Sequence, residues 1–164
     1  MSTTQWSKTL NLWVFTFIKI PLIMWLRPRV IVQDGQKCTV MIKLCRRSKN
    51  HVGSMYFGAL CTGADLTPGL IAIDEIKKQK AKCSFVFKDF NANFLKRCMS
   101  DVYFTCDEGL VIADAVRAAV KTGERQNVTL TVIATTPDIT GAEPMALFKL
   151  TLSIKNRNSE SRRK

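Results

Sequence analysis

Histidine is nearly absent from this chain of 164 residues, in which His51 is the only one. None of the six cysteines has a partner at C-x-x-C spacing. Zinc sites are built from such cysteine pairs and from histidines, so we expect no zinc cluster of this kind. We also expect no cofactor. Four cysteines fall within apolar patterns, where Cys packs as a small hydrophobe, and this favours reduced thiols in a cytoplasmic protein over disulfides. These are Cys38, Cys61, Cys83 and Cys106.

Acidic residues are also scarce, 13 against 25 basic ones, which leaves a net charge of +12. The last ten residues carry five of the basic side chains and one acid, so we expect a basic, disordered tail over residues 156–164. A charge of this size favours anionic partners such as nucleic acid, an acidic membrane or a phosphorylated small molecule. No aromatic residue is interleaved with the basic residues of the tail, so we do not expect stacking on nucleic acid.

The longest apolar run, residues 10–26, is at the lower limit of length for a membrane span, and Lys19 and Pro21 interrupt it. No small-residue cleavage site of a signal peptide follows it. Lys8, Asn11 and Lys19 fall along one stripe of a helix. The pattern predicts an N-terminal apolar helix within residues 1–28 that packs on the domain or at a subunit contact. Peripheral contact with a membrane surface, and a membrane span, remain the alternatives.

The rest of the chain predicts one α+β domain over residues 29–155. Asp34-Gly35 predicts a hairpin turn between two strands, and an apolar helix begins near Met55 or Tyr56. Thr67-Pro68 is typical of a helix start, so we expect the helix to be interrupted or restarted there. Strand patterns at 81–90, 101–107, 126–136 and 145–155 follow, with one amphipathic helix at 108–123. A curved antiparallel sheet wrapped around the central helix is the packing that this order favours.

The stretch "NHVGSMYFGALCTGAD", residues 50–65, resembles the motif of hot-dog-fold thioesterases of the phenylacetyl-CoA thioesterase type. That motif runs N-x-x-G-x-x-H-G-G and continues to a downstream Asp. Asn50, Gly53, Gly58 and Asp65 fall at matching positions, whereas Tyr56-Phe57 replaces His-Gly. The amino-acid sequence of the stretch is more similar still to a poorly characterised branch of the superfamily. The resemblance implies the hot-dog fold with an extra N-terminal helix, assembled as a homodimer or homotetramer.

The resemblance also implies an acyl-CoA or fatty acyl ligand bound at the subunit interface. Asp65 would act as general base or nucleophile, the N–H of Gly58 would hold the oxyanion, and Asn50 would orient the carbonyl or the water. Charge and proximity alone suggest the loop 46–49 as a contact for the phosphates of CoA. The remaining expected substrate-binding positions within the motif are His51, Gly53, Tyr56 and Phe57.

Each assignment has a simpler alternative. Asp65 suits the cap of a second helix as well as a pocket. His51 suits a loop residue that forms hydrogen bonds, and Tyr56 and Phe57 suit core or pocket walls. Tyrosine cannot act as a base near neutral pH, since its ordinary pKa is about 10. The sequence therefore predicts an acyl-CoA thioesterase-like protein, with a non-catalytic acyl- or lipid-binding hot-dog module as the alternative.

Overall fold

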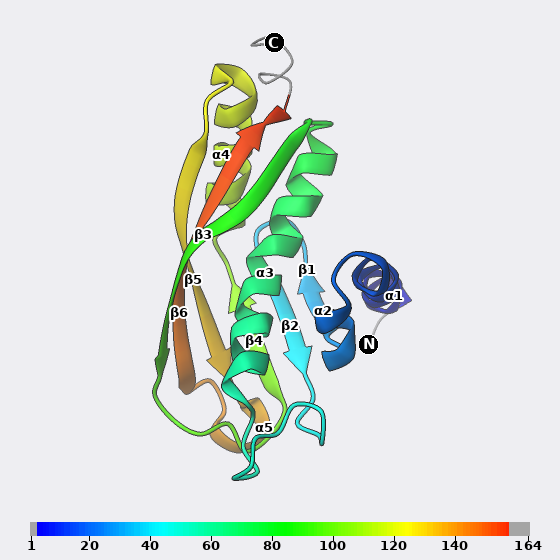
Figure 1. Cartoon of the computed structure of the whole chain (residues 1–164), viewed down its shortest axis with the longest axis vertical. Coiled ribbons are helices and arrows are strands. Elements are labelled where there is room, and N and C mark those ends of the chain that lie inside the picture. The colour runs from blue at the N-terminus through cyan, green and yellow to red at the C-terminus, as the bar shows by residue number, and fades with distance from the viewer. Residues whose placement is uncertain (1–2, 158–164) are drawn as a thin grey trace.

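The computed structural model describes residues 3–157, which form a six-stranded antiparallel sheet curved around one long helix (Figure 1). The strands lie in the order β1-β2-β4-β5-β6-β3. The α+β arrangement predicted from the sequence is confirmed. In chain order the elements are α1 (Thr3–Lys19), α2 (Pro21–Leu26), β1 (Arg29–Gln33), β2 (Cys38–Ile42), α3 (Phe57–Lys78), β3 (Cys83–Phe94), β4 (Val102–Cys106), α4 (Gly109–Thr122), β5 (Gln126–Thr135), α5 (Pro137–Thr140) and β6 (Pro144–Asn156).

The concave face of the sheet holds the core. Alternate residues of the central strands point inward and are fully buried, because the other face of each strand turns to the outside of the sheet. Strand β5 follows the period of two that its sequence predicts, and in β6 the five residues predicted to face inward are all fully buried. The inward residues of β6 are Ala146, Phe148, Leu150, Leu152 and Ile154.

The predicted hairpin forms between β1 and β2. Asp34 organises the turn, since its Oδ1 accepts hydrogen bonds from the N–H groups of Gln36 (3.0 Å) and Lys37 (2.8 Å). Gly35 has φ = +90°, a conformation that side chains other than glycine rarely adopt. The Asp-Gly pair therefore reverses the chain and sets the register of the first two strands.

Helix α3 runs unbroken through Thr67-Pro68, so the predicted interruption is wrong. Pro68 removes one backbone N–H from the helix, and the hydroxyl of Thr67 donates to the carbonyl of Gly63 (2.7 Å). Both residues are buried in the core. Packing on several sides holds the helix together across a proline that would end an exposed one. Because the helix does not restart, Asp65 lies in its interior, and the capping alternative for Asp65 is also wrong.

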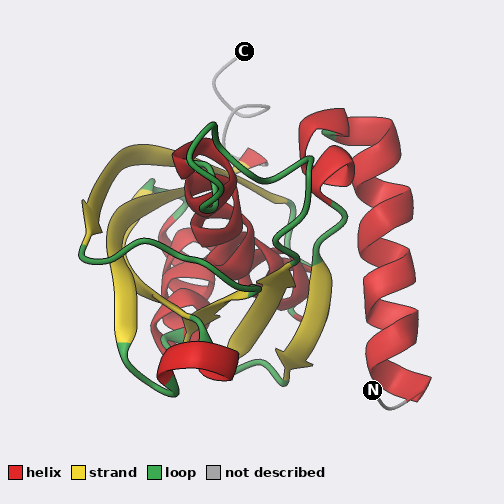
Figure 2. Cartoon of the chain, turned by 90° about the horizontal axis from the view of Figure 1, so that it is seen from below, coloured by secondary structure: helices red, strands yellow, loops and turns green. Residues whose placement is uncertain are grey.

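The predicted apolar helix at the N-terminus is two helices, α1 and α2, with the break at Ile20-Pro21. Figure 2 shows α1 standing beside the sheet, next to β1. We predicted a helix packed on the domain, and α1 does lie against it, through Leu12 and Trp13 at the hydrophobic core and through polar side chains. Fully buried Thr9 and Thr16 lie on its inner side, while most of its large apolar residues are exposed.

Polar side chains of α1 close the free edge of β1. The N–H of Val30 donates to Thr9 Oγ1 (3.1 Å). Gln5 Nε2 donates to the carbonyl of Ile31 (2.5 Å) and Trp13 Nε1 donates to that of Pro28 (2.7 Å). An unpaired strand edge can pair with other chains, and these side chains take up its backbone groups.

Three further expectations concern the ends of the chain and its cysteines. Strand β6 continues to Asn156, and residues 158–164 of the predicted basic tail lie outside the described residues. Within residues 3–157, no helix has the length and apolar character needed to cross a membrane. All six cysteines are free thiols.

Candidate functional site

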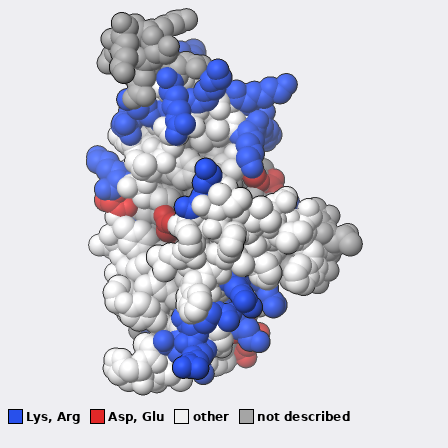
Figure 3. All heavy atoms as spheres, turned by 45° about the vertical axis from the view of Figure 1, so that its right-hand side comes forward, with Lys and Arg blue, Asp and Glu red and all other residues white. Residues whose placement is uncertain are grey.

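A basic loop leads into α3. Lys43, Arg46, Arg47 and Lys49 are all exposed between the end of β2 and the start of the helix. Figure 3 shows Lys and Arg side chains gathered at the lower end of the molecule, which is the end that carries this loop in Figure 1. An antiparallel bridge between Lys49 and Met55 brings the loop back to the helix start. The positive charge therefore lies beside the N-terminus of α3, where an anionic group would be attracted.

Asn50 organises the turn that precedes α3. Its Oδ1 accepts from the N–H groups of Val52 (3.0 Å) and Ser54 (3.2 Å), and its Nδ2 donates to Ser54 Oγ (2.9 Å). Gly53 has φ = +87° and completes the turn. His51 is exposed on the same turn. These contacts give Asn50 and Gly53 a structural role, and their predicted roles toward a ligand stay predictions.

The helix begins with two free backbone donors. Tyr56 occupies the N-cap position, and its own N–H donates to the carbonyl of Ser48 (2.7 Å). No acceptor is recorded within residues 3–157 for the N–H groups of Phe57 and Gly58. Such groups carry partial positive charge at a helix start and can hold an oxyanion. The N–H of Gly58, the predicted oxyanion donor, is therefore available.

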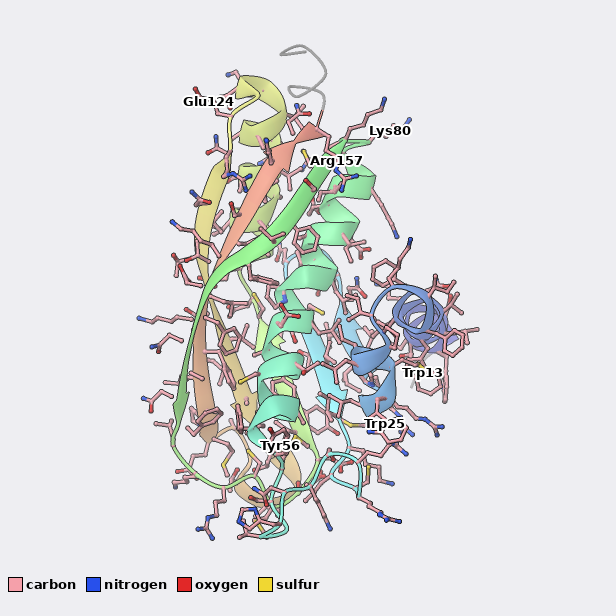
Figure 4. The ribbon with its side chains drawn as sticks, in the orientation of Figure 1. Trp13, Trp25, Tyr56, Lys80, Glu124 and Arg157 are labelled. Carbon is pink, nitrogen blue, oxygen red and sulfur yellow. The ribbon has the colours of Figure 1, made fainter. Side chains whose placement is uncertain are left out.

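Two aromatic rings stand at this helix start. Tyr56 and Phe57 are both exposed, with ring centroids 4.8 Å apart, and Figure 4 places Tyr56 at the lower end of α3. The ring of Tyr56 lies against Gly58, because a Cβ built on Gly58 would come within 2.5 Å of it. Glycine is therefore required at position 58 as long as Tyr56 keeps this rotamer.

Asp65 lies two turns further along α3 and is half-buried. No hydrogen bond or ion pair to its carboxylate is recorded within the described part of the chain. Burial raises the pKa of this carboxyl to about 6, and no nearby cation lowers it. A half-buried acid without a partner is destabilising when ionised, so its presence needs a functional explanation.

One face of α3 carries Gly58, Thr62, Asp65 and Gly69, which follow one another at helical spacing. At Gly69 the rings of Phe85 and Phe87 on β3 cover this face, about 4 Å from a Cβ built there. Nearer the start of the helix, Gly58, Thr62 and Asp65 are only half-buried. The cover from the sheet therefore becomes incomplete where the acid stands.

Strand β3 keeps its aromatic residues on the concave side through a bulge between Phe87 and Asp89. Asp89 Oδ1 accepts from the N–H of Thr151 (3.0 Å) at the bulge. Beyond it, Phe90 and Phe94 both contact the buried ring of Phe148, at centroid distances of 5.7 and 5.9 Å, yet both remain exposed. An apolar surface on the inner side of the sheet is thus left open.

The sequence reasoning assigned no role at this site to four residues near Asp65 or on the open surface. Cys61 and Thr62 stand between Gly58 and Asp65, and helical spacing could have found them. Phe90 and Phe94 are out of phase with Phe85 and Phe87 along the strand, and this shift of one residue is the signal of the bulge. Among residues 3–157, no group of His, Cys, Asp and Glu side chains is arranged to hold a metal ion.

Comparisons with known proteins identify both a family and a fold. The family model "Domain of unknown function (DUF4442)" matches residues 10–146. No functionally curated protein matches the sequence.

Many solved structures share the fold. A protein of unknown function from Chlorobaculum tepidum has a TM-score of 0.80 at 12% identity, over 93% of this chain and 97% of its own. A Pseudomonas aeruginosa protein named "Probable Thioesterase" has a TM-score of 0.75 at 19% identity, over 90% of this chain and 96% of its own. A thioesterase from Haemophilus influenzae has a TM-score of 0.66 at 16% identity, over 90% of both chains. At these identities the likeness establishes the fold, which is the predicted hot-dog fold.

Proposed function

Because this chain belongs to the DUF4442 family and has the hot-dog fold of several thioesterases, we propose that it hydrolyses an acyl thioester, with acyl-CoA as the substrate class. The observation that carries the proposal is Asp65, a half-buried acid in the middle of a buried helix, with no partner among residues 3–157. Burial holds its pKa at about 6, so near neutral pH it is mostly ionised and able to accept a proton.

The proposed site needs two copies of the chain. Gly58 and Asp65 lie on one face of α3 but about 10 Å apart along its axis, so one thioester carbonyl cannot contact both. Two α3 helices side by side in opposite directions would bring Asp65 of one subunit opposite Gly58 of the partner subunit. The open apolar surface around Phe90 and Phe94 is compatible with such a homodimer, and the acyl chain would lie along this surface.

The reaction then follows from these groups. Asp65 takes a proton from a water molecule as the water oxygen attacks the thioester carbonyl. The N–H of the partner subunit's Gly58 holds the negative charge that develops on the carbonyl oxygen. The C–S bond breaks, and the thiolate of CoA recovers the proton from Asp65, which leaves a carboxylic acid and free CoA. The basic loop beside the helix start would bind the CoA phosphates through Arg46, Arg47 and Lys49.

Hydrolysis of a panel of aliphatic and aryl acyl-CoAs, followed by release of the thiol, tests the proposal. Replacing Asp65 by Asn should lower kcat/KM by about 100-fold or more, since a general base contributes that much. The matched control is Asp114→Asn, which changes an exposed acid on α4 and should leave turnover unchanged. In the wild type, kcat/KM should rise with pH through about 6 as Asp65 ionises. Absence of turnover on every substrate would overturn the proposal.

The second candidate is a non-catalytic module that binds an acyl or lipid group. The contact between the Tyr56 ring and Gly58 favours it, because a bulky ring stands beside the proposed oxyanion donor. Native mass spectrometry of the purified protein distinguishes the two. A bound acyl ligand without turnover supports the binding module, and an empty protein that hydrolyses acyl-CoA supports the enzyme.

A further inference from the structure

Helices α1 and α2 expose a continuous apolar surface, which we call the outer apolar face. Phe17, Leu22 and Trp25 are 70%, 67% and 64% exposed. Along α1 the members recur at helical spacing and so share one side of the helix. The face consists of Trp6, Leu10, Val14, Phe17 and Ile18 on α1 and Leu22 and Trp25 on α2.

The outward orientation is a consequence of how α1 is held. Its inner stripe is occupied by side chains that bind backbone groups of the β1 edge, chiefly Gln5, Thr9 and Trp13. Of the large apolar residues of α1, Leu12 and Trp13 pack on the core, and the others face outward. Soluble helices normally show the opposite arrangement, so this face calls for a partner.

Charge around the face is of one sign. The first acidic residue of the chain is Asp34, and the 33 residues before it contain four basic side chains. A hollow at the end of the face has Phe17, Met24 and Trp25 on its apolar walls, with Arg27 and Arg47 on the same rim. Apolar groups bordered by guanidinium groups match the layered chemistry of a lipid surface with anionic headgroups.

Shape and charge favour a lipid surface over a second copy of the chain. Figure 2 shows α1 as a ridge that projects from the body, and Figure 4 places Trp13 and Trp25 on this side of the molecule. The four basic side chains before Asp34 have no acidic residue among them to pair with a second copy of this face, whereas an anionic bilayer attracts their charge. The indole rings of Trp6 and Trp25 also suit the interface between headgroups and acyl chains.

We propose that the outer apolar face docks this protein on the surface of an anionic membrane. The α1 and α2 helices would lie in the plane of the interface, with Arg27 and Arg47 on lipid phosphates. Arg47, in the loop that leads into α3, lines the same hollow as Trp25, so docking would also bring this loop near the lipid. The inference does not depend on the proposed hydrolysis.

Co-sedimentation with phosphatidylcholine vesicles, with and without phosphatidylglycerol, tests the proposal on the full chain. The wild type should bind the anionic vesicles, and less tightly as salt is raised. Leu10→Asp should weaken binding about tenfold or more, because a charge replaces a side chain that enters the interface. The matched control is Leu110→Asp on α4, since Leu10 and Leu110 are 59% and 62% exposed. Arg47→Glu should weaken binding to the vesicles that contain phosphatidylglycerol, and should leave any binding to pure phosphatidylcholine vesicles unchanged.

Tryptophan fluorescence supplies a second readout. In the variant Trp6→Phe/Trp13→Phe, emission comes from Trp25 alone and should shift to the blue when anionic vesicles are added. Absence of wild-type binding, or equal loss for Leu10→Asp and Leu110→Asp, would overturn the proposal. An outer face that instead joins two copies would show as a wild-type oligomer that Leu10→Asp dissociates, with no vesicle binding. That result would also overturn it.

Discussion

The two edges of the sheet differ in whether their outer backbone groups have partners. At one edge, side chains of α1 bind backbone groups of β1, which opposes the addition of another strand there. At the other, β3 is 12 residues long and within residues 3–157 pairs only with β6. Because an unprotected edge of that length attracts another strand, β3 is where a second copy is expected to join. The closed edge and the open edge therefore divide the molecule into two halves.

Helix α3 packs differently against these two halves. A Cβ on Gly63 would come within 2.3 Å of the buried ring of Phe104 on β4, whereas one on Gly69 would lie 3.9 Å from Phe85 on β3. The helix is tightly packed toward the centre of the sheet and loosely packed toward β3. The half-buried Asp65 lies on the same loose side, which is where a ligand or a partner can be accommodated.

The largest expected effect is at the tight contact. Gly63→Ala should destabilise the fold by about 2–3 kcal/mol, because the fully buried ring of Phe104 has to move. Gly69→Ala should be neutral or stabilise by up to about 1 kcal/mol, since alanine favours the helix and meets only ordinary contacts. Urea unfolding of both variants measures the difference. Equal losses would show that the two sides of α3 are packed alike.

Asp65 should weaken the fold at neutral pH. Its pKa is raised from 3.8 to about 6, so as pH rises from about 4 to 6 the ionising carboxylate costs stability. Asp65→Asn should therefore be more stable than the wild type by about 1–2 kcal/mol above pH 6, a figure reduced because solvent partly screens a half-buried carboxylate. Below about pH 4 the two proteins should be equally stable. Urea unfolding at the two ends of this range measures the gain. A constant difference at all pH values would contradict it.

Disruption of the open edge should affect assembly. Val86 is exposed on β3, and Val86→Lys should weaken self-association about tenfold, since lysine on an edge opposes strand pairing. Hydrolysis should fall in parallel if the site spans two subunits. Val111→Lys on α4, also an exposed valine, is the matched control. Sedimentation velocity over a range of concentrations measures both, and identical behaviour would place the subunit contact elsewhere.

The smallest effect is expected at the closed edge. Thr9→Val removes the acceptor of the Val30 N–H and should cost about 1 kcal/mol, because both residues are buried. Thr16→Val is the control, since the Thr16 hydroxyl donates only to carbonyls within α1 and its loss should cost less. Urea unfolding compares them, and a larger loss for Thr16→Val would mean that the edge contact contributes little.

Local patterns in the sequence predicted most of the fold. The Asp34-Gly35 turn, the alternation in β5 and β6 and the helix that ends at Gly123 are all confirmed, because each depends on neighbouring residues. The family motif located the start of α3 and the position of Asp65. The roles assigned to Asp65, Gly58 and Asn50 stay predictions.

The errors arose where distant contacts decide the outcome. Thr67-Pro68 reads as a helix start, but burial from several sides keeps α3 continuous. The apolar run at residues 10–26 reads as one helix, but Pro21 begins a second one, and side chains of α1 also bind the free edge of β1.

The sequence by itself therefore determined the elements, their order and the acid in the central helix, since turn chemistry and periodicity act over a few residues. Tertiary structure alone decided which edge of the sheet is closed, which face of α1 meets solvent and how far Asp65 is buried. Those outcomes depend on which backbone groups lack partners and on how much of the core each element covers, and both are properties of the assembled sheet.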